Sequence, residues 1–203
     1  MVRARAETQG WRAAVDSLRP VSQALWAGAP AAERARFLRH LRPWWDVHRH
    51  RLAPEIAARV AALEAQGRLR FAAGKLIEAR PMEGGAGVRW RVRHGERIET
   101  LRVARIVNCT GPLGDLTQSR DPLLRRLIDA GAIRADAHRL GLDVDAQARV
   151  IDAAGHAQPG LFAVGPITRG AFWEVTAVPD IRRQVWDLAR RLTNAHWVEG
   201  EGL

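Results

Sequence analysis

The chain has 203 residues, which is enough for one large domain or two small ones. Hydrophobic residues make up 47% of it, so a packed core is expected, and its apolar runs are too short for a transmembrane helix. A single cysteine, Cys109, excludes an internal disulfide and a multi-cysteine zinc site. Residues 1–10 carry no apolar stretch typical of a secretory signal, so a cytoplasmic location is expected.

The formal net charge is +10, from 32 basic and 22 acidic residues, and such an excess suggests a polyanion-binding protein. The composition weakens this interpretation, because Lys75 is the only lysine and the arginines are spread along the chain. A nucleic-acid-binding arm normally shows a block of like charges. Nucleic acid is therefore not the expected partner, although a basic polyanion-binding module remains an alternative.

The first third of the chain, residues 1–66, is predicted to be a helical segment. Trp11, Val15 and Leu18 have the i, i+4, i+7 spacing of an apolar helix face. Proline and glycine punctuation predicts further helices in this segment at 21–26, 30–43 and 54–67.

Residues 67–104 are predicted to form a small antiparallel meander. Val88, Trp90 and Val92 alternate with arginines, which is the period of two of a strand with one buried face. A turn at 94–96 then returns the chain into 97–103.

The last region, 105–203, contains two short apolar runs that end in glycine, Ile106–Gly111 and Gly160–Gly165. Each run is typical of a buried parallel strand that feeds a tight loop, and ligands bind at such strand ends in α/β sheets. A helix capped by Asp121 is predicted over 122–128, and a final helix over 179–192. Free N–H groups near Thr176, the predicted N-cap of this last helix, would suit an anion or an electron-rich carbonyl.

Several of these segments resemble a known family. Ile106–Gly111 is similar to the strand ending in Ala-Thr-Gly of two-dinucleotide-binding flavoproteins, and Gly160–Gly165 to their later strand beside the FAD ribityl chain. The chain resembles the C-terminal part of a bacterial FAD/NAD(P)-binding family of flavoprotein oxidoreductases. Three further segments contribute to the resemblance: Phe172–Gln184, Trp44–Arg51 and Arg139–Asp143.

Two departures from the family pattern limit what the resemblance implies. Pro166 stands where the broad pattern has aspartate, and the sequence contains no G-x-G-x-x-G to cradle a pyrophosphate. The resemblance implies an α/β, partial Rossmann-like FAD-binding fold without the half that holds the ADP moiety. Such a chain would bind FAD weakly or only with that missing half, use NAD(P)H and an unknown small-molecule substrate, and be inactive when isolated.

The resemblance also implies a set of cofactor-binding residues. Trp173 could pack on the flavin, but a place in the core is favoured. Glu174 could act near the flavin, but capping of a helix is favoured. Cys109 is expected to be a buried small hydrophobic residue, because redox chemistry of this class uses paired cysteines. The implied residues are Cys109, Thr110, Gly111, Gly165, Pro166, Trp173, Glu174, Thr176, Ala177 and Val178.

A compact cationic patch, formed by His48, Arg49, His50 and Arg51, is a further candidate site. It would contact the phosphates of a nicotinamide cofactor or an acidic substrate, or else be a solvated helix end. On a helix His48 and His50 diverge by roughly 200°, so no metal site is predicted. No catalytic residue is assigned.

A partial fold of this kind is expected to expose a strand edge or an apolar patch. The missing half or self-association would cover it. A third possibility is a non-catalytic remnant that acts only in protein interactions.

Overall fold

In the computed structural model, which describes residues 2–111 and 114–198, the chain is a mixed helix-and-sheet protein, 45% helical, with small antiparallel sheets. It divides into two compact units, one made of residues 1–50 and 112–203 and the other of residues 51–111. None of the described helices combines the length and the apolar character needed to cross a lipid bilayer.

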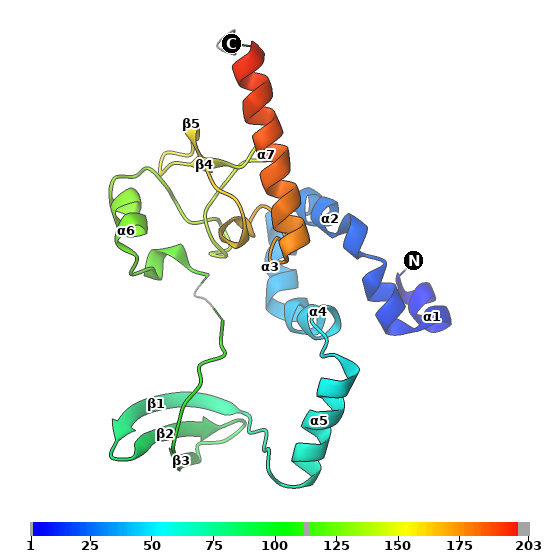
Figure 1. The fold of residues 1–203 in the computed structure, drawn as a ribbon, viewed down its shortest axis with the longest axis vertical. Helices are drawn as coiled ribbons and strands as arrows, with labels where there is room; N and C mark the ends of the chain where they lie inside the picture. The colour runs from blue at the N-terminus through cyan, green and yellow to red at the C-terminus, as the bar shows by residue number, and fades with distance from the viewer. Residues whose placement is uncertain (1, 112–113, 199–203) are drawn as a thin grey trace. The chain divides into compact units, whose positions relative to one another are not determined.

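The N-terminal stretch of the first unit is helical, as predicted (Figure 1). Gly10, with a φ of 81°, interrupts α1. Pro43 lies in the first turn of α4 instead of ending the preceding helix, because proline is tolerated there. A π-helical turn, Phe37–Leu41, links α3 to α4. The helices of this stretch are α1 (Val2–Asp16), α2 (Ser22–Gly28), α3 (Ala31–Arg36) and α4 (Arg42–Arg49).

The C-terminal stretch of the first unit begins with α6 (Pro122–Asp129), where the Asp121 side chain accepts hydrogen bonds from two first-turn amides, as predicted. It continues through β4 (Arg149–Ile151) and β5 (Ala157–Phe162) and ends with α7 (Val178–Val198), which is longer than the predicted helix. The prediction of a buried parallel strand at 160–165 is wrong. A short turn joins β4 to β5, and a turn this short allows only antiparallel pairing.

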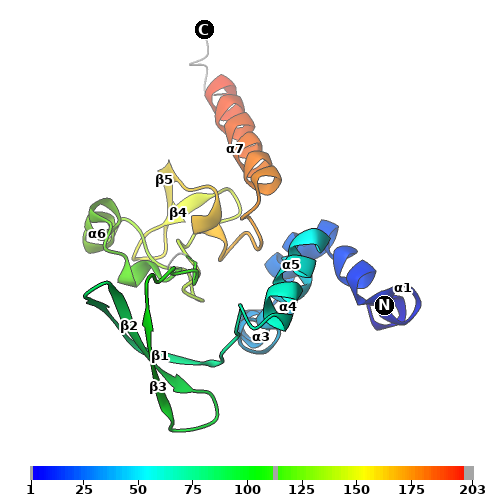
Figure 2. The same cartoon turned by 60° about the horizontal axis from the view of Figure 1, so that its bottom comes forward.

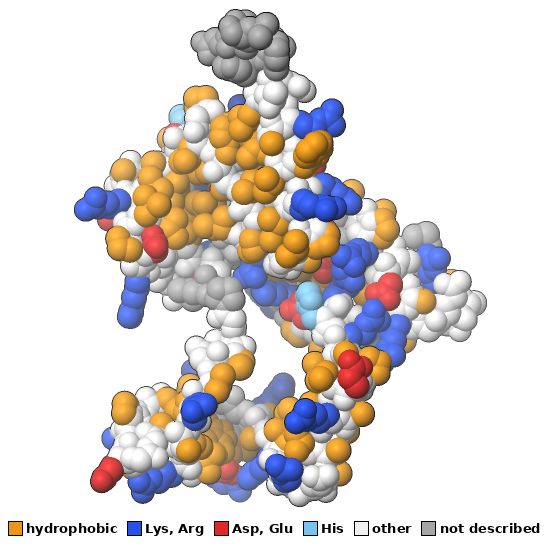
Figure 3. Space-filling model, in the orientation of Figure 1, with side chains coloured by type: hydrophobic (Ala, Val, Ile, Leu, Met, Phe, Trp, Pro, Cys, Tyr) orange, Lys and Arg blue, Asp and Glu red, His pale blue; other side chains and the backbone are white. Residues whose placement is uncertain are grey.

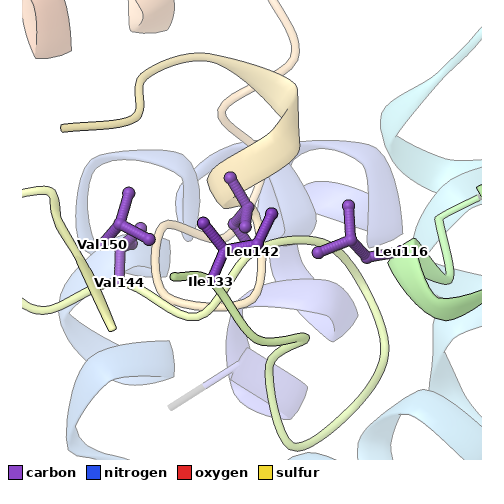
Figure 4. Packing of buried hydrophobic residues seen from close by; sticks show 5 residues of the cluster. All are labelled: Leu116, Ile133, Leu142, Val144 and Val150. Carbon is purple, nitrogen blue, oxygen red and sulfur yellow. The ribbon is translucent and has the colours of Figure 1, made fainter. Parts of the chain in front are cut away.

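Aliphatic side chains form the main core of this unit. Leu116, Ile133, Leu142, Val144 and Val150 are each at most 6% exposed and gather between the loops and short strands (Figure 4). Two isolated bridges, Ala135–Leu142 and Val144–Val150, hold the backbone there. The core therefore draws on irregular structure rather than on a wide sheet.

A second cluster, which we call the tryptophan cluster, joins the two stretches of the first unit. It consists of Trp26, Leu140 and Trp173, each at most 7% exposed, with Phe37 and Trp45 packed against them. The indole of Trp26 donates to the carbonyl of Gly170 over 2.8 Å. The cluster fixes α2 and α4 against the loop that precedes α7.

The second unit contains α5 (Pro54–Ala65) and the predicted meander, β1 (Gly74–Met82), β2 (Gly85–Val92) and β3 (Ile98–Val103). The strand order is β1-β2-β3, with both pairings antiparallel. Figure 2 shows these strands from a second direction. Gly67 ends the helical segment with a φ of 68°, which favours glycine.

The segment that follows β3, residues 104–111, is extended but belongs to no described strand. Val107 is 72% exposed, and Cys109 is exposed as well. The predictions of a buried parallel strand at 106–109 and of a buried Cys109 are therefore wrong. An apolar run becomes a buried strand only where neighbours pair with it, and no described strand does so here.

Candidate functional site

The junction between β5 and α7 is a tightly held turn that we call the Gly165 junction, residues 165–168. Gly165 is buried and has φ 81° and ψ −162°, a conformation that favours glycine. Its amide donates to the Gln184 side chain over 2.7 Å, and Gln184 in turn donates to Thr168 Oγ1 over 3.0 Å. Thr168, which is fully buried, closes the turn by donating to the Gly165 carbonyl over 2.8 Å.

Gln184 and Thr168 were not predicted as site residues. The signal for Gln184 was present, since it lies three residues after Ile181 and four before Leu188, on the apolar stripe of α7. A polar side chain on such a stripe needs a buried partner. Gly165 was predicted to bind the cofactor. Its amide instead donates its hydrogen bond to Gln184 within the protein and so positions the turn.

The N-terminus of α7 lies next along the chain. The Ala177 carbonyl accepts hydrogen bonds from the amides of Asp180 and Ile181, both over 3.0 Å, so α7 begins at Val178. Thr176 is therefore not the N-cap, and its predicted capping role is wrong by one position. Thr176, Ala177 and Val178 are all exposed, and Val178 is 77% exposed.

Two backbone donors remain available at this helix end. Among the described residues, no hydrogen bond is donated by the amides of Ala177 and Val178. A helix N-terminus carries roughly half a positive charge, so these donors suit an electron-rich carbonyl or an anion.

Trp173 is a core residue, as the favoured alternative predicted. Its ring stacks on Trp26 with centroids 4.6 Å apart and meets Phe37 edge-on at 5.4 Å. The Gln23 side chain donates to its carbonyl. These contacts hold Trp173 in place without any ligand.

Glu174 is held by an inward ion pair instead of capping a helix. Its carboxylate accepts from Trp45 Nε1 over 2.9 Å and from Arg49 Nε over 3.1 Å, and both charged side chains are almost buried, 13% and 12% exposed. Its φ of 62° is a left-handed conformation that costs a non-glycine residue free energy, so these contacts must outweigh that cost.

The four residues of the predicted cationic patch differ in their surroundings. Arg49 is engaged with Glu174, and Asp16 lies 3.8 Å from it as well. His50 is exposed, His48 is half-buried, and Arg51 falls in the second compact unit. The residues Cys109, Thr110 and Gly111 also belong to that unit, where Asn108 accepts hydrogen bonds from the Thr110 amide and hydroxyl over 3.0 and 2.8 Å.

A hollow of about 230 Å³ lies beside Pro166 in the first unit. Its walls include Leu116 and Ile167, and its polar lining includes Asp115 and Arg169. Burial, together with the nearby charge of Arg42, lowers the pKa of the Arg169 guanidinium. The guanidinium donates to the Leu140 carbonyl over 3.2 Å, so a fixed cation stands next to the Gly165 junction.

These features are compatible with the ring end of a flavin and not with its pyrophosphate end. Gly165 is buried, yet a β-carbon added to it would meet no atom within 4 Å, so its backbone leaves open space. The α7 amides and Arg169 add donors nearby in the chain. In contrast, no segment of the sequence has the glycine spacing that cradles a pyrophosphate.

Comparison with known proteins adds no family: no family model matches the chain, and no curated protein matches it significantly.

Proposed function

We propose that this chain is the flavin-side, C-terminal portion of an FAD-dependent, NAD(P)-linked oxidoreductase with a partial Rossmann-like fold. The observation that carries the proposal is the Gly165 junction, which Gln184 of α7 holds, while the Ala177 and Val178 amides at the start of α7 donate to no described residue. Together with the sequence resemblance, this arrangement supports a site built to face a carbonyl-bearing ring.

Each part of the site has a distinct role in this proposal. The Ala177 and Val178 amides would donate to the flavin carbonyls, and Arg169 would place a positive charge beside Pro166. Gln184 and Thr168 keep the turn rigid, while Trp173 and Glu174 fix the loop that leads into α7. When bound, a flavin supplies the redox chemistry, taking a hydride from nicotinamide and passing the electrons to an acceptor.

Tight FAD binding would require a complementary half that carries G-x-G-x-x-G. Contacts to the pyrophosphate and adenosine supply much of the affinity for a dinucleotide, and this sequence has no motif for them. The exposed apolar side chains support a covered state, since hydrophobic groups gather over the region of α7 (Figure 3) and Trp186 on that helix is 63% exposed. The complementary half, or a second copy of the chain, would cover them.

The experiment is to purify the chain alone and together with a co-expressed G-x-G-x-x-G half, and to measure bound flavin per protein. We expect little flavin in the isolated chain and near-stoichiometric flavin in the pair. Full flavin occupancy of the isolated chain would contradict the need for a second half, and no flavin in either sample would contradict the flavin site itself.

Two matched variants locate the flavin site within the complex of the chain and its complementary half. Gln184→Ala frees the Gly165 junction, so we expect it to lower flavin occupancy several-fold, by about 1 kcal/mol or more. Gln147→Ala removes an exposed side chain of the same type and should leave occupancy unchanged.

A second candidate function, polyanion binding, has one specific observation in its favour. Strand pairing places Lys75 opposite Arg91, and Arg80 and Arg102 opposite Gly87, so these cations share one sheet face with Arg89. Glu78 balances part of this charge through ion pairs to Arg80 and Arg89 at 2.8 and 3.3 Å.

Titration with duplex and single-stranded nucleic acid at two salt concentrations tests this candidate. Binding through the face requires an affinity that falls steeply with salt, and replacing Arg89 and Arg91 with Gln should lower the slope by about 2. Replacing Arg3 and Arg5, exposed on α1, removes the same charge elsewhere and should change the slope little. Equal effects of both pairs would reject the face as the site.

A further inference from the structure

A second hollow, of about 350 Å³, lies entirely within the first unit, against the tryptophan cluster. Four aromatic side chains contribute to its walls: Trp26, Phe37, Trp45 and Trp173. Of these walls, only Trp173 also has a role in the proposed flavin site, where it fixes a loop. Its volume is that of a site for a small organic molecule.

The aromatic walls are fixed in place without a ligand. Phe37 lies 6.1 Å from both Trp26 and Trp45 in edge-on geometry and 5.4 Å from Trp173. The two indole N–H groups of Trp26 and Trp45 donate elsewhere, to Gly170 and Glu174. The walls therefore present mainly carbon surface, and no fully buried side-chain donor of the described residues lacks a partner, which suits a planar apolar ring.

The polar lining of the hollow is dominated by one oriented cation. The Arg34 guanidinium lies 5.4 Å from the centroid of the Trp26 ring. Its Nε and Nη2 donate to the carbonyls of Ala29 and Ala27 over 2.9 and 2.8 Å, which fixes its orientation. Its Nη1 has no hydrogen-bond partner among the described residues, so one edge of the guanidinium remains available to a ligand.

The one acidic side chain in the lining is Glu33, and its charge is partly offset. Arg36 donates to Glu33 Oε1 over 3.3 Å across the helix surface. The pair is exposed and therefore screened by solvent, so it weakens the field of Glu33 without removing it. Because Arg36 offsets the negative charge of Glu33, the positive charge of Arg34 dominates the lining. The hollow therefore favours a ligand with a negative group.

We propose that this hollow binds a small planar aromatic carboxylate. The ring would pack among the four aromatic walls, and the carboxylate would accept hydrogen bonds from the free edge of Arg34, a geometry that guanidinium favours over ammonium. This site does not depend on a flavin or on a complementary half.

The direct experiment is a fluorine NMR titration of the chain with 4-fluorobenzoate, with 4-fluorobenzylamine as the matched cationic probe. We expect 4-fluorobenzoate to bind with a Kd on the order of 0.1–1 mM and the amine about tenfold more weakly. Near-UV circular dichroism should change on binding of the acid, because the tryptophan cluster forms the walls. Equal binding of the two probes, or no binding of the acid up to about 10 mM, would overturn the proposal.

Two neighbouring substitutions should act with opposite sign. Arg34→Gln should weaken 4-fluorobenzoate binding about tenfold, and Glu33→Gln should strengthen it by about two- to threefold, because it removes a like charge. Arg39→Gln, in the π-helical turn and outside the lining, is the charge-matched control and should change nothing.

The Glu33 variant keeps the test decisive if Arg34→Gln disturbs the end of α2. A Glu33→Gln variant that binds no better than the unchanged chain would count against the proposal on its own. Weaker binding by Arg39→Gln equal to that of Arg34→Gln would show a general effect of charge and would also overturn it.

Discussion

Every buried hydrophobic side chain that the structure describes lies in the unit formed by residues 1–50 and 112–203, and none lies in 51–111. In the first unit an aliphatic core and the tryptophan cluster remove side chains from water. In the second unit the three-stranded sheet leaves most of its side chains exposed, and Gly87 is its one buried residue. The first unit is therefore held by packing, and the second by its backbone ladder.

The charge follows the same division. The second unit has 12 basic and 6 acidic side chains, against 20 and 16 in the first, which together give the 32 and 22 of the whole chain. The net charge of +10 is thus densest where there is least core. A small sheet with both faces open is marginal by itself, so this unit is the part of the molecule that depends most on a partner.

The largest effect should come from a matched pair of leucines. Leu142→Ala, at 6% exposure in the aliphatic core, should lower the free energy of unfolding by about 2–5 kcal/mol. Leu101→Ala, at 51% exposure on the sheet, should lower it by less than about 1 kcal/mol. Chemical denaturation measures both. Equal losses of unfolding free energy would mean that the sheet face is covered in solution. The contrast between a packed first unit and an open second unit would then be wrong.

A backbone clash should affect the second unit alone. A β-carbon at Gly85 would overlap the Val103 carbonyl across the β2–β3 pairing, so Gly85→Ala should cost about 1–3 kcal/mol there. Amide hydrogen exchange should speed up in β1–β3 and stay unchanged in β4 and β5. Gly95→Ala is the control, because its β-carbon would lie 3.9 Å from the nearest atom.

Breaking an ion pair should also destabilise the first unit more than the second. Glu174→Gln removes the closer and more buried of the two carboxylates beside the nearly buried Arg49 and should cost about 1–3 kcal/mol. Glu96→Gln, 93% exposed and paired with Arg91 at 3.4 Å, should cost no more than about 0.5 kcal/mol. A thermal or denaturant melt of each variant gives the two values, and a larger cost for Glu96 would contradict the assignment.

The smallest effect is a difference in salt sensitivity between two carboxylates. Hydrogen bonds from Thr117 and Gln118 lower the pKa of Asp115 to about 2, whereas Arg80 lowers the pKa of Glu78 in the second unit. Both groups stabilise the fold above their unfolded pKa values and lose that contribution as pH falls through the folded ones, for Asp115 between about pH 4 and pH 2.

Carboxyl NMR titration at low and high salt distinguishes the two causes. Added salt should raise the pKa of Glu78, because its partner is a charge, and should leave Asp115 nearly unchanged, because its partners are mainly neutral. A salt shift at Asp115 as large as that at Glu78 would disagree with this account.

Local signals in the sequence predicted local structure well. The Asp121 cap, the Gly67 helix end and the strand around Trp90 each depend on a few neighbouring residues, and each of these predictions is confirmed. The buried face predicted for that strand is wrong, because Val88, Trp90 and Val92 are only half-buried. The wrong predictions concern partners. Ile106–Cys109 has the composition of a buried strand, but burial requires strands from elsewhere in the chain or in another chain.

In the candidate site, too, the sequence predicted single residues but not their distant partners. The junction at Gly165 and the core place of Trp173 were predicted, yet the contacts that define them come from residues far along the chain. Glu174 meets Trp45 and Arg49 across more than a hundred residues, and no local pattern around Glu174 encodes that pairing. Only Gln184, a polar residue on an apolar stripe, signalled its role.

The extended segment 104–111 has a consequence for limited proteolysis. It is exposed and unpaired among the described residues, so a protease can reach its backbone. A cut there would separate the chain into two pieces, each holding one stretch of the first unit. The stacked rings of Trp26 and Trp173, one in each piece, would keep the pieces associated after the covalent link is gone. The nicked protein would then migrate as one species under native conditions and as two in denaturant, a natural split-protein pair.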